Sequence, residues 1–271
     1  MATTDLLVED RHFRRKWSTP YDVGRRAAAQ NLADVAAMGA APTALLVGLA
    51  VPPDLPLSWA EGLADGLGAE CARVGAGVAG GDVVRADRLT IAITALGDLG
   101  GRAAVTRSGA RPGDVVAIAG HLGHAAAGFA LLEAGLDAPA VAVDRYRCPD
   151  PPYAEGPHAA DLGATAMIDV SDGLLSDLGH VAEASGAAID LNAAALAPAA
   201  LLREAAAALG GPDPMEWVLR GGEDHALAAT FPTAAEPPAP WRPVGRVRTG
   251  APGVTLDGAP VGGSGGWDHF A

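Results

Sequence analysis

Apolar and polar positions along the chain follow two periods, one typical of strands and one typical of helices. Short apolar runs at 4–8, 43–51 and 115–120 predict buried strands. Longer stretches of small and apolar residues at 21–40 and 57–75 predict helices, and Gly39 closes the first. Further strands are predicted at 76–82, 88–99, 187–191, 226–231 and 243–247, and further helices at 124–134 and 199–209. The chain therefore mixes strands and helices throughout.

One segment of this pattern lacks regular periodicity. Residues 100–114 are rich in glycine and turn-forming residues and contain no apolar run. The segment is the best candidate for a domain boundary and predicts two domains, at 1–106 and 107–271. Because strands and helices alternate on both sides of it, we expect an α/β (α+β) fold in each half.

Composition and charge exclude several classes of protein. With 19 basic and 32 acidic residues, the formal net charge is −13, which argues against nucleic acid or an anionic membrane as the partner. No apolar run reaches the 18 or so residues of a membrane span. The two cysteines, Cys71 and Cys148, form no CxxC pair. That usage predicts a reduced, cytoplasmic protein without a disulfide framework or a zinc site.

Five aspartates stand among small or apolar residues, unlike typical surface acids. Buried carboxylates need a partner, and too few basic residues lie near these motifs to pair them all. Two carboxylates 4 Å apart repel by about 4 kcal/mol at an effective dielectric near 20. If the five converge, a hard cation such as Mg²⁺ must lie between them. The five are Asp5, Asp34, Asp82, Asp169 and Asp172.

Each acid also has a simpler interpretation. Asp34 could lie on an exposed helix face, and Asp82 could be a turn residue after two glycines. Asp169 and Asp172 could form a strand-end turn, with Ser171 or Asp172 as the N-cap of the next helix. These simpler interpretations would all have to be true at once, because the acids stand in similar positions. Both interpretations stay open at this point.

If metals gather there, we expect them to bind a nucleotide, because carboxylate-held Mg²⁺ commonly bridges to phosphates. The sequence contains neither a GxxxxGK[ST] loop nor a GxGxxG turn after a strand. The Gly-rich turn at 120–128 could hold phosphate at a helix N-terminus, but it equally fits a plain strand–turn–helix connection. Metals and backbone amides would then hold the nucleotide, which suffices for phosphoryl transfer.

Several motifs in order carry a resemblance to a known family. They include NLADVAAMGA (31–40), VSDGLLSDLGH (170–180), GGED (221–224) and WDHF (267–270). Over residues 3–270 the chain resembles the thiamine-monophosphate kinases, in the superfamily of aminoimidazole ribonucleotide synthetase and selenophosphate synthetase. The resemblance implies the two-domain architecture of that synthetase and a homodimer paired through the N-terminal sheets. It also implies direct in-line transfer of phosphate from ATP to thiamine monophosphate.

The resemblance further implies roles for individual residues. Metal ligands, for several Mg²⁺ ions, fall on Thr3, Thr4, Asp5, Asp34, Asp82, Asp169 and Asp172. The resemblance implies catalytic roles for Asp34, Asp5 and Asp172. It implies nucleotide contacts by Gly81, Asp82, Arg107 and Ser171. Contacts to thiamine monophosphate fall on His12, Glu223 and Trp267. From the residues alone, these last three could equally be a surface histidine, a turn acid and a C-terminal anchor into the core.

The chain departs from the family pattern in a few places. Asp10 stands where a glycine is usual, which could alter a tight turn, and GGEDHAL replaces the usual GGEDYEL. Family members also carry an N-terminal segment with a Gly-Asp-Asp before the point where this sequence starts. This leaves two alternatives open, a catalytically impaired nucleotide-binding homologue and another ATP-dependent synthetase of the superfamily. The selenophosphate branch is disfavoured because no cysteine lies near the N-terminus.

Overall fold

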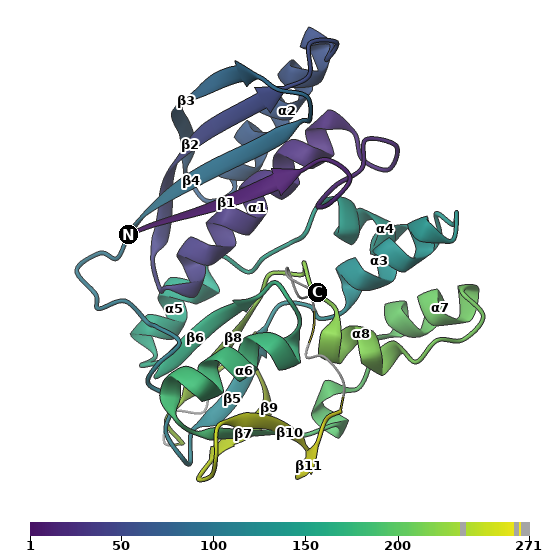
Figure 1. The fold of residues 1–271 in the computed structure, drawn as a ribbon. Helices are drawn as coiled ribbons and strands as arrows, with labels where there is room; N and C mark the ends of the chain where they lie inside the picture. Colours follow the sequence, from purple (N-terminus) through teal and green to yellow (C-terminus); the bar gives the residue numbers. More distant parts are fainter. Residues whose placement is uncertain (234–236, 263–265, 267–271) are drawn as a thin grey trace.

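The first half of the chain forms a four-stranded mixed sheet with two helices against one face (Figure 1). The strand order is β1-β4-β2-β3, with β2 and β3 parallel and β4 antiparallel to both of its neighbours. β1 and β3 are therefore opposite edges. The computed structural model describes all residues except 234–236, 263–265 and 267–271. The elements of this half are β1 (Ala2–Val8), α1 (Pro20–Ala37), β2 (Ala41–Val51), α2 (Leu57–Ala72), β3 (Gly77–Arg85) and β4 (Thr90–Asp98).

Local signals explain where α1 begins and how it packs. Thr19 and Asp22 form a reciprocal capping box, and Pro20 occupies the first helical turn. α1 and α2 then approach closely through glycines. A Cβ at Gly24 would lie 2.1 Å from the carbonyl oxygen of Leu63. Within 57–75, a Cβ at Gly66 would likewise lie 2.1 Å from the carbonyl oxygen of Tyr21, so this glycine serves close helix packing and does not break the predicted helix.

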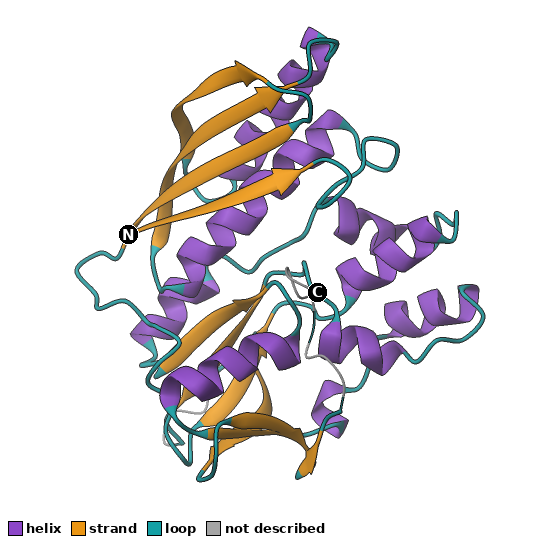
Figure 2. Ribbon diagram, viewed as in Figure 1, coloured by secondary structure: helices purple, strands orange, loops and turns teal. Residues whose placement is uncertain are grey.

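The second half forms a seven-stranded sheet in the order β11-β10-β7-β9-β5-β8-β6, and α6 crosses one of its faces (Figure 2). β5, β6 and β8 are buried along their whole length. Its strands are β5 (Val115–Ala119), β6 (Ala166–Val170), β7 (Ala188–Leu191), β8 (Ala226–Phe231), β9 (Arg242–Arg248), β10 (Gly253–Leu256) and β11 (Ala259–Pro260). Its helices are α3 (His124–Glu133), α4 (Ala140–Arg147), α5 (Glu155–Asp161), α6 (Leu174–Ser185), η1 (Ala194–Leu196), α7 (Ala200–Ala208) and α8 (Pro214–Arg220).

The predicted mixture of strands and helices is confirmed, but three short helices were missed. α4 and α5 flank the proline-rich segment RCPDPPY (147–153), which shows no helical period. α8 does carry start signals, because Asp213 caps it and Pro214 follows. At seven residues its apolar pattern is too short to show a period. β10 and β11 lie in the glycine-rich segment after residue 247, where no strand was predicted.

The two halves meet along α1. At Gly156 in α5, a Cβ would lie 2.0 Å from the carbonyl oxygen of Ala36, so only glycine allows this contact. A small apolar cluster joins Ala37 and Val105 to β5, β6 and β8. This packing sets the C-terminal part of α1 beside β6, and α1 contacts β6 directly. Among the described residues, no helix has the length and apolar character needed to cross a membrane.

Candidate active site

β1 and α1 supply the first group of polar side chains. Alternation along β1 turns Thr3 and Asp5 toward α1. The Thr3 hydroxyl donates to Asp34 Oδ2 at 2.9 Å, and the Gln30 amide donates to Asp5 Oδ2. Thr4 points to the other face, where its hydroxyl donates to the carbonyl of Ile93 at 3.0 Å. The structure thus gathers Thr3, Asp5 and Asp34, and turns the side chain of Thr4 away.

The second group comes from β6 and the start of β8. Asp169, near the end of β6, is 6% exposed, and its Oδ2 lies 3.1 Å from Nδ1 of the equally buried His225. Burial works against protonation of His225. The hydrogen bond to Asp169 and the charges of Asp169 and Asp34 outweigh it and raise the pKa of His225. His225 thus lies among the acids as the hydrogen-bond partner of Asp169.

Asp34 and Asp169 bring the two groups together across the halves of the chain. Burial, followed by the charges of Asp169 and Asp5, raises the pKa of Asp34 to about 7, although the Thr3 hydroxyl and His225 oppose the rise. The protein's own cations therefore leave negative charge uncompensated at this point. A hard divalent cation with oxygen ligands would remove that excess.

Residues 171–177 form a turn held by a carboxylate from inside the next helix. Asp177 is buried, and its Oδ2 accepts the backbone N–H groups of Asp172 and Gly173, each at 3.1 Å. Burial and the charges of Asp169 and Asp172 raise the pKa of Asp177 to about 7. The N-cap of α6 is Gly173, with no side-chain cap. The alternative of Ser171 or Asp172 as N-cap is therefore wrong, and Asp172 stays in the turn beside Asp169.

Glu223 faces the same region from the loop before β8. It adopts a left-handed conformation with φ of 69°, and its N–H donates to the Ser171 carbonyl at 2.7 Å. Arg26, buried in α1, donates to both Glu223 and the Tyr146 carbonyl. The Glu223 side chain nevertheless remains 42% exposed. Arg26 was missed because a single arginine within a helix gives no sign that it is buried.

The loop after β1 holds His12. Its Nδ1 accepts the N–H of Val8 at 2.9 Å, which leaves the proton of the neutral ring on Nε2. Asp10, which replaces the usual glycine, takes φ of 65°. Asp10 adopts the left-handed backbone conformation that a glycine would take, so the tight turn is kept.

Gly81 and Asp82 lie on β3, the sheet edge opposite β1. Asp82 is in register with Gly48, Ala92 and Leu6, so its side chain shares the outer face with Leu6. Three strand spacings separate the two edges, roughly 14 Å. Asp82 lies in a strand, so the turn interpretation is wrong. The structure of one chain does not bring Asp82 to the other acids.

The remaining predicted residues are a loop arginine and the terminal tryptophan. Arg107 has an exposed side chain, and its carbonyl accepts the Ser185 hydroxyl at 3.1 Å. Trp267 lies outside the described residues. Two backbone N–H groups of the turn at 120–128 are not available to a phosphate. The buried Asp224 accepts Gly123 N–H at 2.5 Å and Ala125 N–H at 2.8 Å. A carboxylate from 100 residues away thus occupies this helix N-terminus, which favours a structural connection.

The residues present fit a hard cation by their chemistry. Thr3, Asp5, Asp34, Asp169 and Asp172 provide only oxygen donors. Within the described parts of the chain, no group of three or more His, Cys, Asp or Glu side chains is arranged to hold a metal ion by itself. An open arrangement suits Mg²⁺, which keeps waters and bridges to phosphate oxygens instead of filling a protein cage.

Comparison with known proteins agrees with this arrangement. Residues 1–99 match the family model "AIR synthase related protein, N-terminal domain". The thiamine-monophosphate kinase of Mycobacterium tuberculosis is 52% identical over 270 residues, covering 100% of this chain and 80% of the relative. The crystal structure of thiamine monophosphate kinase from Aquifex aeolicus has a TM-score of 0.89 and 32% identity, covering 97% of this chain and 88% of the other.

A second structure, AaThiL complexed with AMPPCP and TMP, has a TM-score of 0.92 and 33% identity, covering 99% of this chain and 86% of the other. The identity with the mycobacterial relative extends over the full chain, and both solved structures share its two-sheet fold. The resemblance seen in the motifs is therefore confirmed. The chain belongs to the thiamine-monophosphate kinase family.

Proposed function

We propose that the chain phosphorylates thiamine monophosphate to thiamine diphosphate, with ATP as the donor, by direct in-line transfer. The observation that carries this is the meeting of Asp34 and Asp169, which joins two oxygen-rich groups at the junction of the two halves. Likeness to AaThiL, which was solved with AMPPCP and TMP, supports the identity of both substrates. Phosphoryl transfer needs positioning and charge neutralisation, and this site offers both.

We assign Mg²⁺ to the oxygen-rich groups. Asp5, Asp34, Asp169 and Asp172 would hold it, with the Thr3 hydroxyl beside Asp34. Bound there, Mg²⁺ neutralises phosphate charge during transfer. His225 fixes one carboxylate oxygen of Asp169, so the other oxygen stays available to a ligand. Asp177 holds the backbone that carries Asp172. Thr4 can contribute only through its backbone, because its hydroxyl is bonded on the far face of the sheet.

We assign the acceptor to the region around Glu223. The Glu223 carboxylate is anchored by Arg26 yet partly exposed, so it can lie beside the cationic thiazolium. His12 can donate its Nε2 proton to the acceptor phosphate, because Nδ1 is already bonded to Val8. Trp267 is proposed to stack on the heterocycle. Ser171, Gly81 and Arg107 are proposed nucleotide contacts.

We further propose a homodimer paired through the outer face of the first sheet. That face carries exposed apolar side chains on all four strands, at Leu6, Leu46, Val84 and Leu96. Such a continuous apolar surface favours association. Asp82 lies on the same face, so pairing would carry it toward a second chain. A monomer in light scattering at micromolar concentration would contradict this proposal.

We propose residues 1–106 and 107–271 as the two domains, because β4 ends at Asp98 and β5 begins at Val115. We propose the cytoplasm as the compartment, which suits the free thiols of Cys71 and Cys148.

The test of the function is direct. Purified protein is incubated with Mg-ATP and thiamine monophosphate, and thiamine diphosphate and ADP are separated chromatographically. We expect the two products in equal amounts and neither one after chelation of the metal. ADP release without thiamine diphosphate, or no product while ATP still binds, would overturn the assignment.

A further inference from the structure

A cavity of about 580 Å³ lies on the β9 side of the second sheet. It is bordered by Arg73 at the end of α2, His121 and His124 in the turn after β5, and Arg242 at the start of β9. β5 and β8 separate β9 from β6, which carries Asp169. The residues that line the cavity include none of Asp5, Asp34, Asp169 and Asp172, so it is distinct from the cluster of acids. Its volume lies within the range of small-molecule sites.

The wall of this cavity contains an unsatisfied polar group. His124 is 7% exposed, and its Nδ1 has no hydrogen-bond partner among the described residues. The ring stacks on His121, with centroids 4.6 Å apart and planes 14° apart. Burial, His121 and Arg145 lower the pKa of His124 to about 4, so the ring is neutral at pH 7. A buried polar atom without a partner costs about 1–3 kcal/mol, so the protein tolerates an unusual histidine in this wall.

The cavity is also positively charged within an acidic protein. Asp150 accepts from Arg73 at 2.5 Å and pairs with Arg145 at 2.8 Å, and Arg73 also pairs with the buried Glu70 at 2.6 Å. Arg242 forms no ion pair with any described residue and has an exposed side chain. The surroundings therefore carry an excess of positive charge in a chain whose net charge is −13. That excess favours an anion and disfavours a cation such as the thiazolium.

Apolar side chains form the rest of the wall. Leu122, Leu196 and Val218 line it and are buried, and Pro151 and Pro152 also line it. An apolar surface beside two stacked imidazole rings suits a flat ring. We propose that this cavity binds a small phosphate monoester with a neutral, flat apolar body, its phosphate facing Arg242 and Arg73 and its ring against the histidine pair.

The proposal can be tested without the kinase reaction. The full chain in EDTA is titrated with phenyl phosphate while the imidazole signals of its seven histidines are followed by ¹H–¹³C NMR. Without metal, the acids of the active site repel anions, so binding there does not interfere. The signal of His124 is identified by its loss in His124→Gln. We expect it to shift saturably, with submillimolar affinity.

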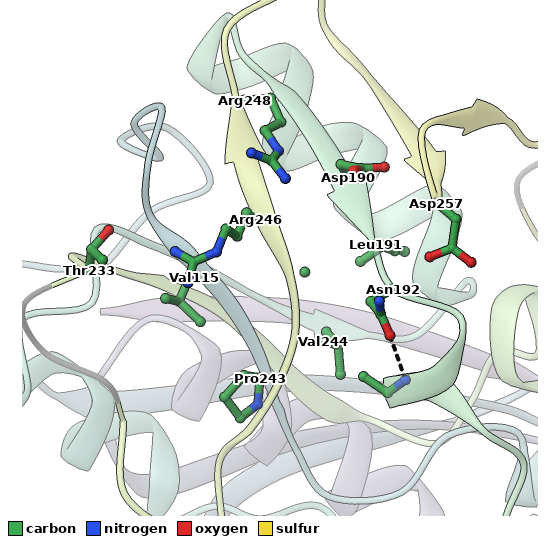
Figure 3. Close-up of a pocket in the computed structure, with 12 residues that line it drawn as sticks. Val115, Asp190, Leu191, Asn192, Thr233, Pro243, Val244, Arg246, Arg248 and Asp257 are labelled. Carbon is green, nitrogen blue, oxygen red and sulfur yellow. Dashed lines mark hydrogen bonds between the residues drawn. The ribbon is translucent and has the colours of Figure 1, made fainter.

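Two arginine variants give the matched comparison. Arg242→Gln is expected to weaken binding at least tenfold. Arg246→Gln removes an arginine of the same strand that lines a different pocket, beside Val115 and Asp190 (Figure 3), and is expected to leave binding unchanged. Both side chains are exposed, so circular dichroism and the melting temperature should show folded proteins.

Three outcomes would overturn the proposal. The first is no saturable shift of His124, and the second is equal weakening by both arginine variants, which would indicate nonspecific attraction. The third is binding of inorganic phosphate as tight as that of phenyl phosphate, which would show that the apolar wall contributes nothing to affinity. Weak binding of phosphate and of phenol, each alone, would support the combined ligand. Because no metal or turnover is involved, these results do not depend on the kinase assignment.

Discussion

Nδ1 of His225 lies 3.1 Å from Oδ2 of Asp169, and both side chains are buried. This bond joins the loop before β8 to the end of β6 and orients a carboxylate that the proposed site uses for Mg²⁺. The chain has histidine here within GGEDHAL, where the family pattern has tyrosine. The substitution therefore acts on the carboxylate of Asp169.

The first prediction concerns this bond. His225→Phe should lower kcat about 10- to 100-fold and raise the Mg²⁺ concentration needed for half-maximal rate, because Asp169 loses its partner. His225→Asn keeps a donor near Nδ1 and should recover part of the loss. Steady-state kinetics over a Mg²⁺ series measures both. His180→Asn, an exposed change on α6, is the control. An unchanged Mg²⁺ dependence in His225→Phe would show that the bond serves only folding.

The second prediction concerns Asp34. Asp34→Asn should lower kcat about 100-fold or more, because it removes a charged oxygen ligand between the two groups. The fold should survive, since the amide can still accept from Thr3. Asp65→Asn changes an exposed acid on α2 and should keep full activity. Turnover near that of the wild type in Asp34→Asn would argue strongly against this site.

The third prediction concerns pH in the absence of metal. Asp34, Asp177 and Asp224 each have a pKa raised from 3.8 to about 7 by burial above all. Between these values the folded chain binds more protons than the unfolded chain, so these groups lower the free energy of unfolding as pH rises. Urea unfolding in EDTA should show lower stability at pH 7.5 than at pH 5.

Metal and mutation should each reduce that pH dependence. Mg²⁺ at pH 7.5 should stabilise the protein, because it replaces the proton at Asp34. Asp34→Asn should show a shallower loss of stability between pH 5 and 7.5, since one of the three groups is gone. A loss as steep as in the wild type would mean that Asp34 does not titrate in this range.

The strands and the acids at their ends could be predicted from sequence because both depend on local pattern. Asp5, Asp34, Asp169 and Asp172 each stand in an apolar context that marks them as unusual. The roles of Arg26, Asp177 and His225 could not be predicted, because each depends on a partner brought close by folding. The outward position of Asp82 likewise follows from strand order and register, which a single apolar run does not reveal.

The fourth prediction concerns Asp224, whose carboxylate accepts two backbone N–H groups at the start of α3. Asp224→Ala would leave both donors buried without a partner, at about 1–3 kcal/mol each. The free energy of unfolding, measured in urea, should therefore fall by about 2–6 kcal/mol. Asp213→Ala, at the exposed N-cap of α8, should cost only about 1 kcal/mol. Equal losses in the two variants would mean that water replaces Asp224.

The fifth prediction separates the two substrates. Glu223→Gln removes the negative charge that Arg26 holds beside the proposed thiazolium position, while the amide still accepts a hydrogen bond. KM for thiamine monophosphate should rise about tenfold, equivalent to about 1.4 kcal/mol, and KM for ATP should stay unchanged. Glu61→Gln, an exposed change on α2, should alter neither constant. If KM for ATP rose instead, Glu223 would belong with the nucleotide, and the acceptor would have to bind elsewhere.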